Sequence, residues 1–177
     1  MTADTDGSPA AASPRRVTFA VGYQLRRAHT QFTAHWLLCF RTAGVPITPV
    51  QGGMLIQISE KPGLTQIELA RAMSVEGPTL LHSINRLQSL GYLTRQRLPR
   101  DRRAHALNLT AEGRRALDIV MHLLPAHEAE LLDPLSAVER THFLGCLRRL
   151  TAHGEIVLRR AHAAERESAM PDEPGED

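Results

Sequence analysis

Hydrophobic residues recur every three or four positions over most of this chain, which is the spacing of helices with one buried face. The first such segment covers about residues 16–42, and Gly44 and Pro46 interrupt it. A second segment begins after Thr48 and Pro49, which suit the N-cap and first turn of a helix. The first third of the chain therefore predicts two amphipathic helices.

A second pair of helices, separated by a very short turn, follows. Thr65 and Glu68 have the spacing of a capping box, so a helix is expected from there to Met73. Ser74 and its neighbour form the turn. The next helix opens at residues 76–78, where a proline is tolerated in the first turn. Two helices joined in this way are typical of a helix-turn-helix.

The second helix of this pair has one apolar face. Its apolar residues recur at spacings of four and three: Leu80, Ile84 and Leu87. The polar residues between them are expected to point outward: Thr79, His82, Ser83, Asn85 and Arg86. Such side chains are placed to enter a DNA groove.

The pattern then changes from helical to alternating. Gly91 suits a left-handed C-cap, and residues 92–97 and 104–109 have the alternation of two strands. Residues 98–103 between them form an arginine-rich loop. The order of helix, turn, helix and hairpin predicts a winged helix-turn-helix that is mainly α with a small β-hairpin.

Two further helices complete the pattern. Thr110 caps one that extends to Pro125, which is expected to perturb it, and continues beyond. Ser136 and Glu139 form a second capping box ahead of a long final helix that is expected to fray near Ala163.

Charge is distributed unevenly, although the net charge of the 177 residues is only +2. Residues 65–115 contain nine arginines and four acidic residues, so positive charge is concentrated in the predicted helix-turn-helix and hairpin. No apolar run approaches the roughly 20 residues of a membrane span, and residues 1–14 do not resemble a secretory signal. With only two cysteines, a disulfide framework is not expected. We expect a soluble, cytoplasmic protein that does not contact membranes.

Two sequence blocks resemble the MarR family, and its SlyA-like branch in particular: GLTQIELARAMSVEGPTLLHSINRLQSLGYL and DRRAHALNLTAEG. The similarity covers roughly Gly22 to Leu117. It implies a homodimer that binds a pseudo-palindromic site in double-stranded DNA as a transcriptional regulator, and we expect a repressor. The expected segments are a disordered tail (1–15), an N-terminal dimerisation helix (16–45), the DNA-binding lobe (46–110), C-terminal dimerisation helices (111–162) and an acidic disordered tail (163–177).

The polar face and the resemblance together provide candidate DNA contacts. In the reading helix they are Pro78, Thr79, His82, Asn85 and Arg86. In the β-hairpin of residues 92–109, which is the wing of the fold, they are Arg97, Arg100, Asp101, Arg102 and Arg103. Asn85 and Arg86 suit bidentate contacts with base edges, although Arg86 is also able to pair with Asp101. The resemblance assigns Arg103 to the minor groove and Asp101 to fixing the loop, and the other wing arginines then contact phosphates. His82 is equally explained as a solvent-exposed residue.

The large residues of the first two helices allow two interpretations. The simplest is that they form the core. The resemblance implies instead a pocket for small aromatic or anionic ligands that modulate DNA binding, lined by Phe32, Trp36, Phe40, Gln51, Met54 and Leu55.

Metal and catalytic motifs are weak. His29 and His35 are six residues apart and His122 and His127 five, whereas a spacing of four would place a pair on one helical face. We expect no metal site and no cofactor. Nucleophile elbows, phosphate-binding glycine loops and paired-cysteine motifs are absent from the sequence, so an enzyme is not expected.

Three alternatives stay open. Cys39 and Cys146 are interpreted as buried structural thiols, but Arg41, or Arg148 and Arg149, could activate them for redox sensing. A metal-responsive regulator is a related alternative. The third is a helical interaction protein that keeps the fold without reading DNA.

Overall fold

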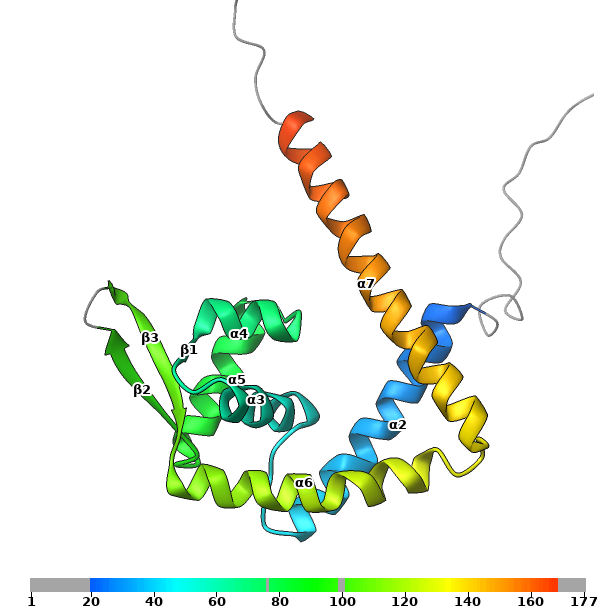
Figure 1. Ribbon diagram of the computed structural model, residues 1–177, viewed down its shortest axis with the longest axis horizontal. Coiled ribbons are helices and arrows are strands. Elements are labelled where there is room, and N and C mark those ends of the chain that lie inside the picture. The colour runs from blue at the N-terminus through cyan, green and yellow to red at the C-terminus, as the bar shows by residue number, and fades with distance from the viewer. Residues whose placement is uncertain (1–19, 76, 99–100, 169–177) are drawn as a thin grey trace, which may run out of the picture. The chain divides into compact units, whose positions relative to one another are not determined.

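A computed structural model describes residues 20–75, 77–98 and 101–168, and the chain divides into two compact units between Ala129 and Glu130. The elements, shown in Figure 1, are α2 (Val21–Thr42), α3 (Pro49–Glu60), β1 (Leu64–Thr65), α4 (Gln66–Met73), α5 (Gly77–Ser89), β2 (Leu93–Leu98), β3 (Asp101–Leu109), α6 (Ala111–Leu131) and α7 (Ala137–Ser168). Across these ranges no helix combines the length and the apolar character that crossing a membrane requires. The predicted fold class, mainly helical with a small β-structure, is confirmed.

Side-chain caps fix the starts of the helices, as the sequence predicts. The Thr48 hydroxyl accepts a hydrogen bond from the Gln51 amide, and the Gln51 side-chain oxygen accepts one from the Thr48 amide, at 3.2 and 3.0 Å. The Thr110 hydroxyl accepts from the Gly113 amide at 2.9 Å. Both caps satisfy amides that have no partner within their own helix.

The three strands form one antiparallel sheet in the order β1-β3-β2. β2 and β3 are the predicted hairpin, with Leu93 opposite Leu109. β3 already begins at Asp101, so part of the predicted loop belongs to the strand. β1 pairs Leu64 with Leu107 and was not predicted, because two residues are too short to show an alternating pattern.

The start of α6 lies close against the residue that precedes β2. A Cβ atom added to Gly113 would lie 2.0 Å from the carbonyl oxygen of Tyr92. The Thr110 amide donates a hydrogen bond to the same oxygen at 3.1 Å. Glycine is therefore required where α6 begins. Farther along, the expected perturbation at Pro125 does not end the helix, which continues to Leu131.

The predicted capping box at the start of α7 is present. The Ser136 amide and hydroxyl donate to the Glu139 carboxylate at 2.8 and 2.7 Å, and the hydroxyl accepts from the Glu139 amide. The two bonds to the carboxylate, first the one from the hydroxyl and then the one from the amide, lower the pKa of Glu139. α7 runs to Ser168, so the expected fraying near Ala163 and the tail boundary at 162/163 are placed too early.

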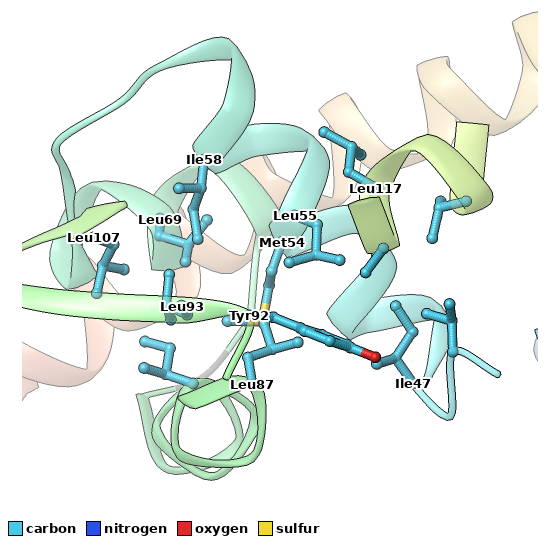
Figure 2. Close-up of a cluster of buried hydrophobic side chains, with 14 of the residues drawn as sticks. Ile47, Met54, Leu55, Ile58, Leu69, Leu87, Tyr92, Leu93, Leu107 and Leu117 are labelled. Carbon is cyan, nitrogen blue, oxygen red and sulfur yellow. The ribbon is translucent and has the colours of Figure 1, made fainter. Parts of the chain in front are cut away.

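The hydrophobic core of the first unit joins the helices to the sheet (Figure 2). Side chains from α3, α4, α5 and β3 meet there, including the fully buried Leu55, Leu69, Leu87 and Leu107. Burying a side chain of this size contributes about 1.5–3 kcal/mol. The core holds one face of α5 and leaves the other face to solvent.

Candidate nucleic-acid interface

The candidate reading residues share the exposed face of α5. Pro78, Thr79, His82, Asn85 and Arg86 are all exposed, whereas Leu80, Ile84 and Leu87 are fully buried. Ser83 is 6% exposed, so the expectation that it points outward is wrong. Its place three residues after Leu80 and four before Leu87 puts it on the buried face despite its polarity.

Asn85 is held by an arginine that was not among the candidate contacts. The Asn85 side-chain oxygen accepts a hydrogen bond from Nη2 of Arg95 on β2, at 2.8 Å. The Nε atom of Arg95 is buried without a hydrogen-bond partner among the described residues. Arg95 precedes Arg97 by two residues, and this alternation along one strand is the signal that could have identified it.

The candidate wing residues are only partly described. Arg97 lies on β2 and is exposed. Arg100 lies outside the described residues. The first three residues of β3 are Asp101, Arg102 and Arg103, whose side chains lie outside the described part of the chain. The alternative pairing of Arg86 with Asp101 therefore lies outside it as well.

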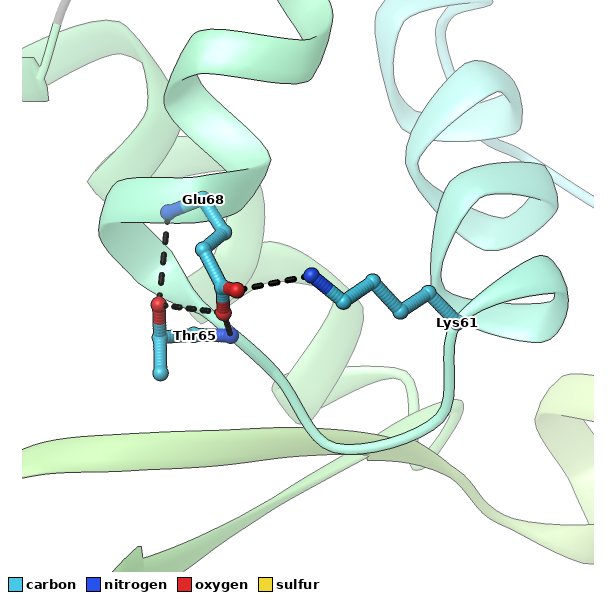
Figure 3. Close-up of polar contacts among 3 residues, drawn as sticks. All are labelled: Lys61, Thr65 and Glu68. Atoms are coloured by element: carbon cyan, nitrogen blue, oxygen red, sulfur yellow. Dashed lines mark hydrogen bonds and ion pairs between the residues drawn. The ribbon is translucent and has the colours of Figure 1, made fainter.

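The first helix of the motif is fixed by a charged capping box (Figure 3). The Thr65 amide and hydroxyl each donate to the Glu68 carboxylate at 2.8 Å, as the sequence predicts. Lys61 Nζ also donates to this carboxylate at 2.7 Å, a contact that the capping pattern does not predict. The bond from Lys61 first, and then those from Thr65, lower the pKa of Glu68 to about 2.

The turn after α4 begins at Ser74, as the sequence predicts. Ser74 has a φ of 49°, in the left-handed region, and ends the helix there. The Val75 amide donates to the Ala70 carbonyl at 3.3 Å, which closes the last turn. This short reversal places α5 immediately after α4.

The candidate ligand residues are packed side chains. Phe32 is half-buried, and Trp36, Phe40, Gln51, Met54 and Leu55 are buried. Trp36 stacks on Phe40 at 3.9 Å between ring centroids, and its indole nitrogen donates to the Ile47 carbonyl at 2.9 Å. Gln51 is engaged in the cap of α3. A surface hollow near the end of α3, lined by Ile58, Ser59, Pro62, Asn108, Leu109 and Arg114, contains none of them.

A different set of polar residues comes together between α2 and α6. His35, Cys39 and His127 each place a nitrogen or sulfur atom within 4.8 Å of the other two. The sequence prediction of no metal site compared histidines only with histidines. The signal that it missed is the spacing of four between His35 and Cys39. Cys39 is half-buried and Cys146 is exposed, so the expected burial of Cys146 is wrong.

Comparisons with known proteins agree with this geometry. The model of the MarR family matches residues 45–104. A protein of Thauera aromatica named for transcriptional regulation of the hcr operon is 32% identical over 136 residues, covering 73% of this chain and 78% of that protein.

Solved structures of similar fold include two regulators. The PcaV transcriptional regulator from Streptomyces coelicolor, in complex with its natural ligand, has a TM-score of 0.70 and 26% identity, covering 81% of this chain and 98% of that chain. The transcriptional repressor CouR, bound to a 23-mer DNA duplex, has a TM-score of 0.70 and 29% identity, covering 80% of this chain and 99% of that chain. The elements described above are therefore those of a winged-helix DNA-binding fold.

Proposed function

The chain belongs to the MarR family of transcriptional regulators, and from this premise we propose that it is a homodimeric repressor that reads a pseudo-palindromic DNA site. The main support is that α5 exposes one polar face, while its apolar face is buried in the core and fixes the helix in place. The major groove is wide enough to admit a helix, whose polar side chains then reach base edges.

In this proposal, α5 and the wing contact different parts of the DNA. Asn85 and Arg86 make the base contacts, and Pro78, Thr79 and His82 complete the surface that enters the groove. Arg97, Arg100 and Arg102 contact phosphates, Arg103 enters the minor groove, and Asp101 fixes the loop. Contacts with phosphates position the protein, and contacts with bases give specificity.

The proposed dimer uses the long terminal helices. α7 exposes apolar side chains at helical spacing, among them Phe143, Leu150 and Val157, which are 37, 54 and 48% exposed. A stripe of this kind is normally covered in a soluble assembly. A second copy of the chain supplies the cover and sets two reading helices about 34 Å apart, one turn of DNA.

We further propose that the chain belongs to the SlyA-like branch, because its motif blocks resemble those of that branch. A small aromatic or anionic ligand is proposed to shift the geometry of the dimer. Support comes from PcaV, a regulator of similar fold that was solved with its natural ligand. Such a ligand acts only through a difference in affinity for the two conformations.

The test is selection of bound sequences from a random duplex pool, followed by a salt titration on the enriched sequence. An inverted repeat with half-sites about one helical turn apart, bound with steeply salt-dependent affinity, is the expected result. If the folded, dimeric protein enriches no motif at physiological salt, the proposal fails and the interaction-protein alternative replaces it.

A further inference from the structure

Two histidines and one cysteine from two helices form a cluster in the first compact unit. His35 and Cys39 lie one turn apart on α2, and His127 lies in the last part of α6. The two Nδ1 atoms of the histidines are 2.8 Å apart. Sγ of Cys39 is 3.5 Å from Nε2 and 4.0 Å from Nδ1 of His35. Residues 92 positions apart in sequence thus present their polar atoms to one small volume.

The two imidazole rings meet edge to edge. Their planes differ by only 13°, and their centroids are 5.0 Å apart. This separation exceeds that of the two Nδ1 atoms by about twice the radius of an imidazole ring. Both nitrogens therefore lie near the line between the centroids and point toward each other. One must donate and the other accept, unless a cation takes the place of the shared proton.

We propose that His35, Cys39 and His127 form a binding site for one transition-metal ion of the Zn²⁺ class. Imidazole nitrogen and thiolate sulfur are the ligands that Zn²⁺ takes, whereas Mg²⁺ and Ca²⁺ require oxygen atoms, which this cluster lacks. Three protein ligands leave a fourth position of the tetrahedron for water or a small anion.

The distances fit a tetrahedral ion after a small displacement. Usual Zn–N and Zn–S lengths place two nitrogen ligands about 3.3 Å apart and a nitrogen and a sulfur ligand about 3.6 Å apart. With Nδ1 of His35 as the ligand, the nitrogen that faces His127, its distance of 4.0 Å from Cys39 Sγ has to close by about 0.4 Å. The nitrogen pair at 2.8 Å has to open by about half an ångström, which rotations of the two side chains can supply.

Aromatic side chains surround the cluster on the side of His127, which is itself 5% exposed. The ring centroids of Phe32, Trp36 and Phe40 lie 6.0, 5.5 and 6.4 Å from that of His127, and the ring planes meet at 89, 88 and 73°. An apolar shell restricts the access of water to bound metal and fixes the orientation of the ligand ring. The aromatic residues predicted to bind a small organic ligand are, in this view, the wall of the metal site.

The ion would join two helices that both reach the winged-helix lobe. Trp36, next to His35, packs so closely on α3 that a Cβ atom added to Gly52 would lie 2.6 Å from its ring. At its other end α6 rests on the carbonyl of Tyr92 beside β2. Metal binding is therefore expected to change DNA affinity, a consequence that rests on the proposed function, whereas the site itself does not.

The first measurement is Co²⁺ titration of the full-length, metal-free, reduced protein without DNA. We expect saturation at one ion per chain, with visible bands of tetrahedral cobalt and a thiolate-to-cobalt charge-transfer band that Zn²⁺ then abolishes. Zn²⁺ should also raise the melting temperature, because it binds the folded state preferentially. A titration without saturable cobalt bands and without a Zn²⁺-dependent change in melting temperature overturns the proposal.

Matched variants assign the ligands. Cys39→Ser should remove the charge-transfer band, and Cys39→Ser and His35→Gln should each weaken Zn²⁺ binding by at least roughly tenfold in competition with a chromophoric chelator. The controls are Cys146→Ser and His122→Gln, which change exposed residues outside the cluster and should bind as the unaltered protein does. Circular dichroism verifies folding of each variant. If Cys39→Ser keeps the band, or a control loses it, the assignment is wrong.

DNA binding with and without Zn²⁺ separates the two proposals. A change in DNA affinity in the unaltered protein that is lost in Cys39→Ser supports metal control. Saturable metal binding without any DNA binding refutes the proposed function and leaves the site intact. Sequence-specific DNA binding by a protein that binds no metal refutes the site and leaves the function intact.

Discussion

Asn85 shows how a candidate base-reading residue depends on its neighbour. A bidentate contact with adenine requires the oxygen and the amide nitrogen of asparagine together. In the structure the oxygen accepts a hydrogen bond from Arg95, which occupies one of its two lone pairs and ties the orientation of the side chain to β2. Arg86, one position farther along the same exposed face, is the better candidate for direct reading.

We predict that Arg86→Ala weakens binding to the selected DNA site by about 1–3 kcal/mol, the usual value of a good bidentate base contact. The loss should be largest at one base pair of each half-site, as competition with single-base variants of the duplex will show. Arg41→Ala, an exposed arginine near the end of α2, is the matched control. If Arg86→Ala lowers the affinity for all duplexes by the same factor, Arg86 contacts a phosphate and not a base.

Gly113 is a second residue whose role comes from a single close approach. The atom nearest to an added Cβ belongs to the backbone of Tyr92 and cannot rotate away. Gly113→Ala should therefore lower the free energy of unfolding by about 1–3 kcal/mol, in the range of other overpacked substitutions. Gly22→Ala, where an added Cβ meets nothing within 4 Å, should be near neutral. Urea denaturation of both variants provides the comparison, and equal midpoints would contradict the close approach.

At the scale of the element, the start of α4 carries a pH-dependent contribution to stability. The pKa of Glu68 is lowered to about 2 in the folded protein from an ordinary value of 4.5. The carboxylate therefore stabilises the fold fully above pH 4.5, and this contribution is lost as the pH falls toward 2.

We predict that Glu68→Gln reduces the decline in unfolding free energy between pH 4.5 and 2. Urea denaturation at several pH values in this window will measure it. Glu60→Gln, an exposed carboxyl residue at the end of α3, should keep the steeper decline of the unaltered protein. Identical pH profiles for Glu68→Gln and the unaltered protein would show that the capping box does not carry this contribution.

Elements set by local chemistry could be predicted from the sequence. The boxes at Thr65 and Ser136 involve residues three apart, and the left-handed Gly91 (φ 74°) is a property of one residue. β1 could not be predicted, because its two residues become a strand only by pairing with β3. α7 continues to Ser168 although its last large apolar residue is Leu158, so the end of the apolar pattern does not mark the end of this helix.

The candidate site follows the same division. The exposed face of α5 could be read from spacing, except at Ser83, where polarity was given more weight than position. The pair of Asn85 and Arg95 joins a helix to a strand, and the histidine–cysteine cluster joins two helices. Periodicity along the chain places each of these residues on a face of its own element, but which residue of another element it meets depends on how the elements pack.

At the scale of the whole molecule, the two compact units differ in what they bury. The first unit contains all of the fully buried large side chains among the described residues. In α7, by contrast, apolar side chains such as Leu144 and Leu158 are 46 and 59% exposed. These exposed apolar side chains are the physical argument for a partner along α7.

We predict that Leu150→Glu converts a dimer into a monomer without unfolding the chain. Leu150 is 54% exposed in the single chain, so a carboxylate there stays hydrated, whereas in a dimer it would be buried without a partner at a cost of about several kcal/mol. Light scattering after size exclusion will measure the mass, and circular dichroism will verify the helices. Ala152→Glu, on the opposite side of the same exposed helix, should stay dimeric.

The same variant tests whether the dimer is the DNA-reading unit. Each protomer retains α5, so monomeric Leu150→Glu should still bind a single half-site with the affinity of the unaltered protein. It should lose the preference for the inverted repeat and for one fixed half-site spacing, since only the dimer sets two reading helices about one turn of DNA apart. If Leu150→Glu is monomeric and binds the full site as tightly as the unaltered protein, specificity resides in one protomer and the proposed dimeric mode of reading is wrong.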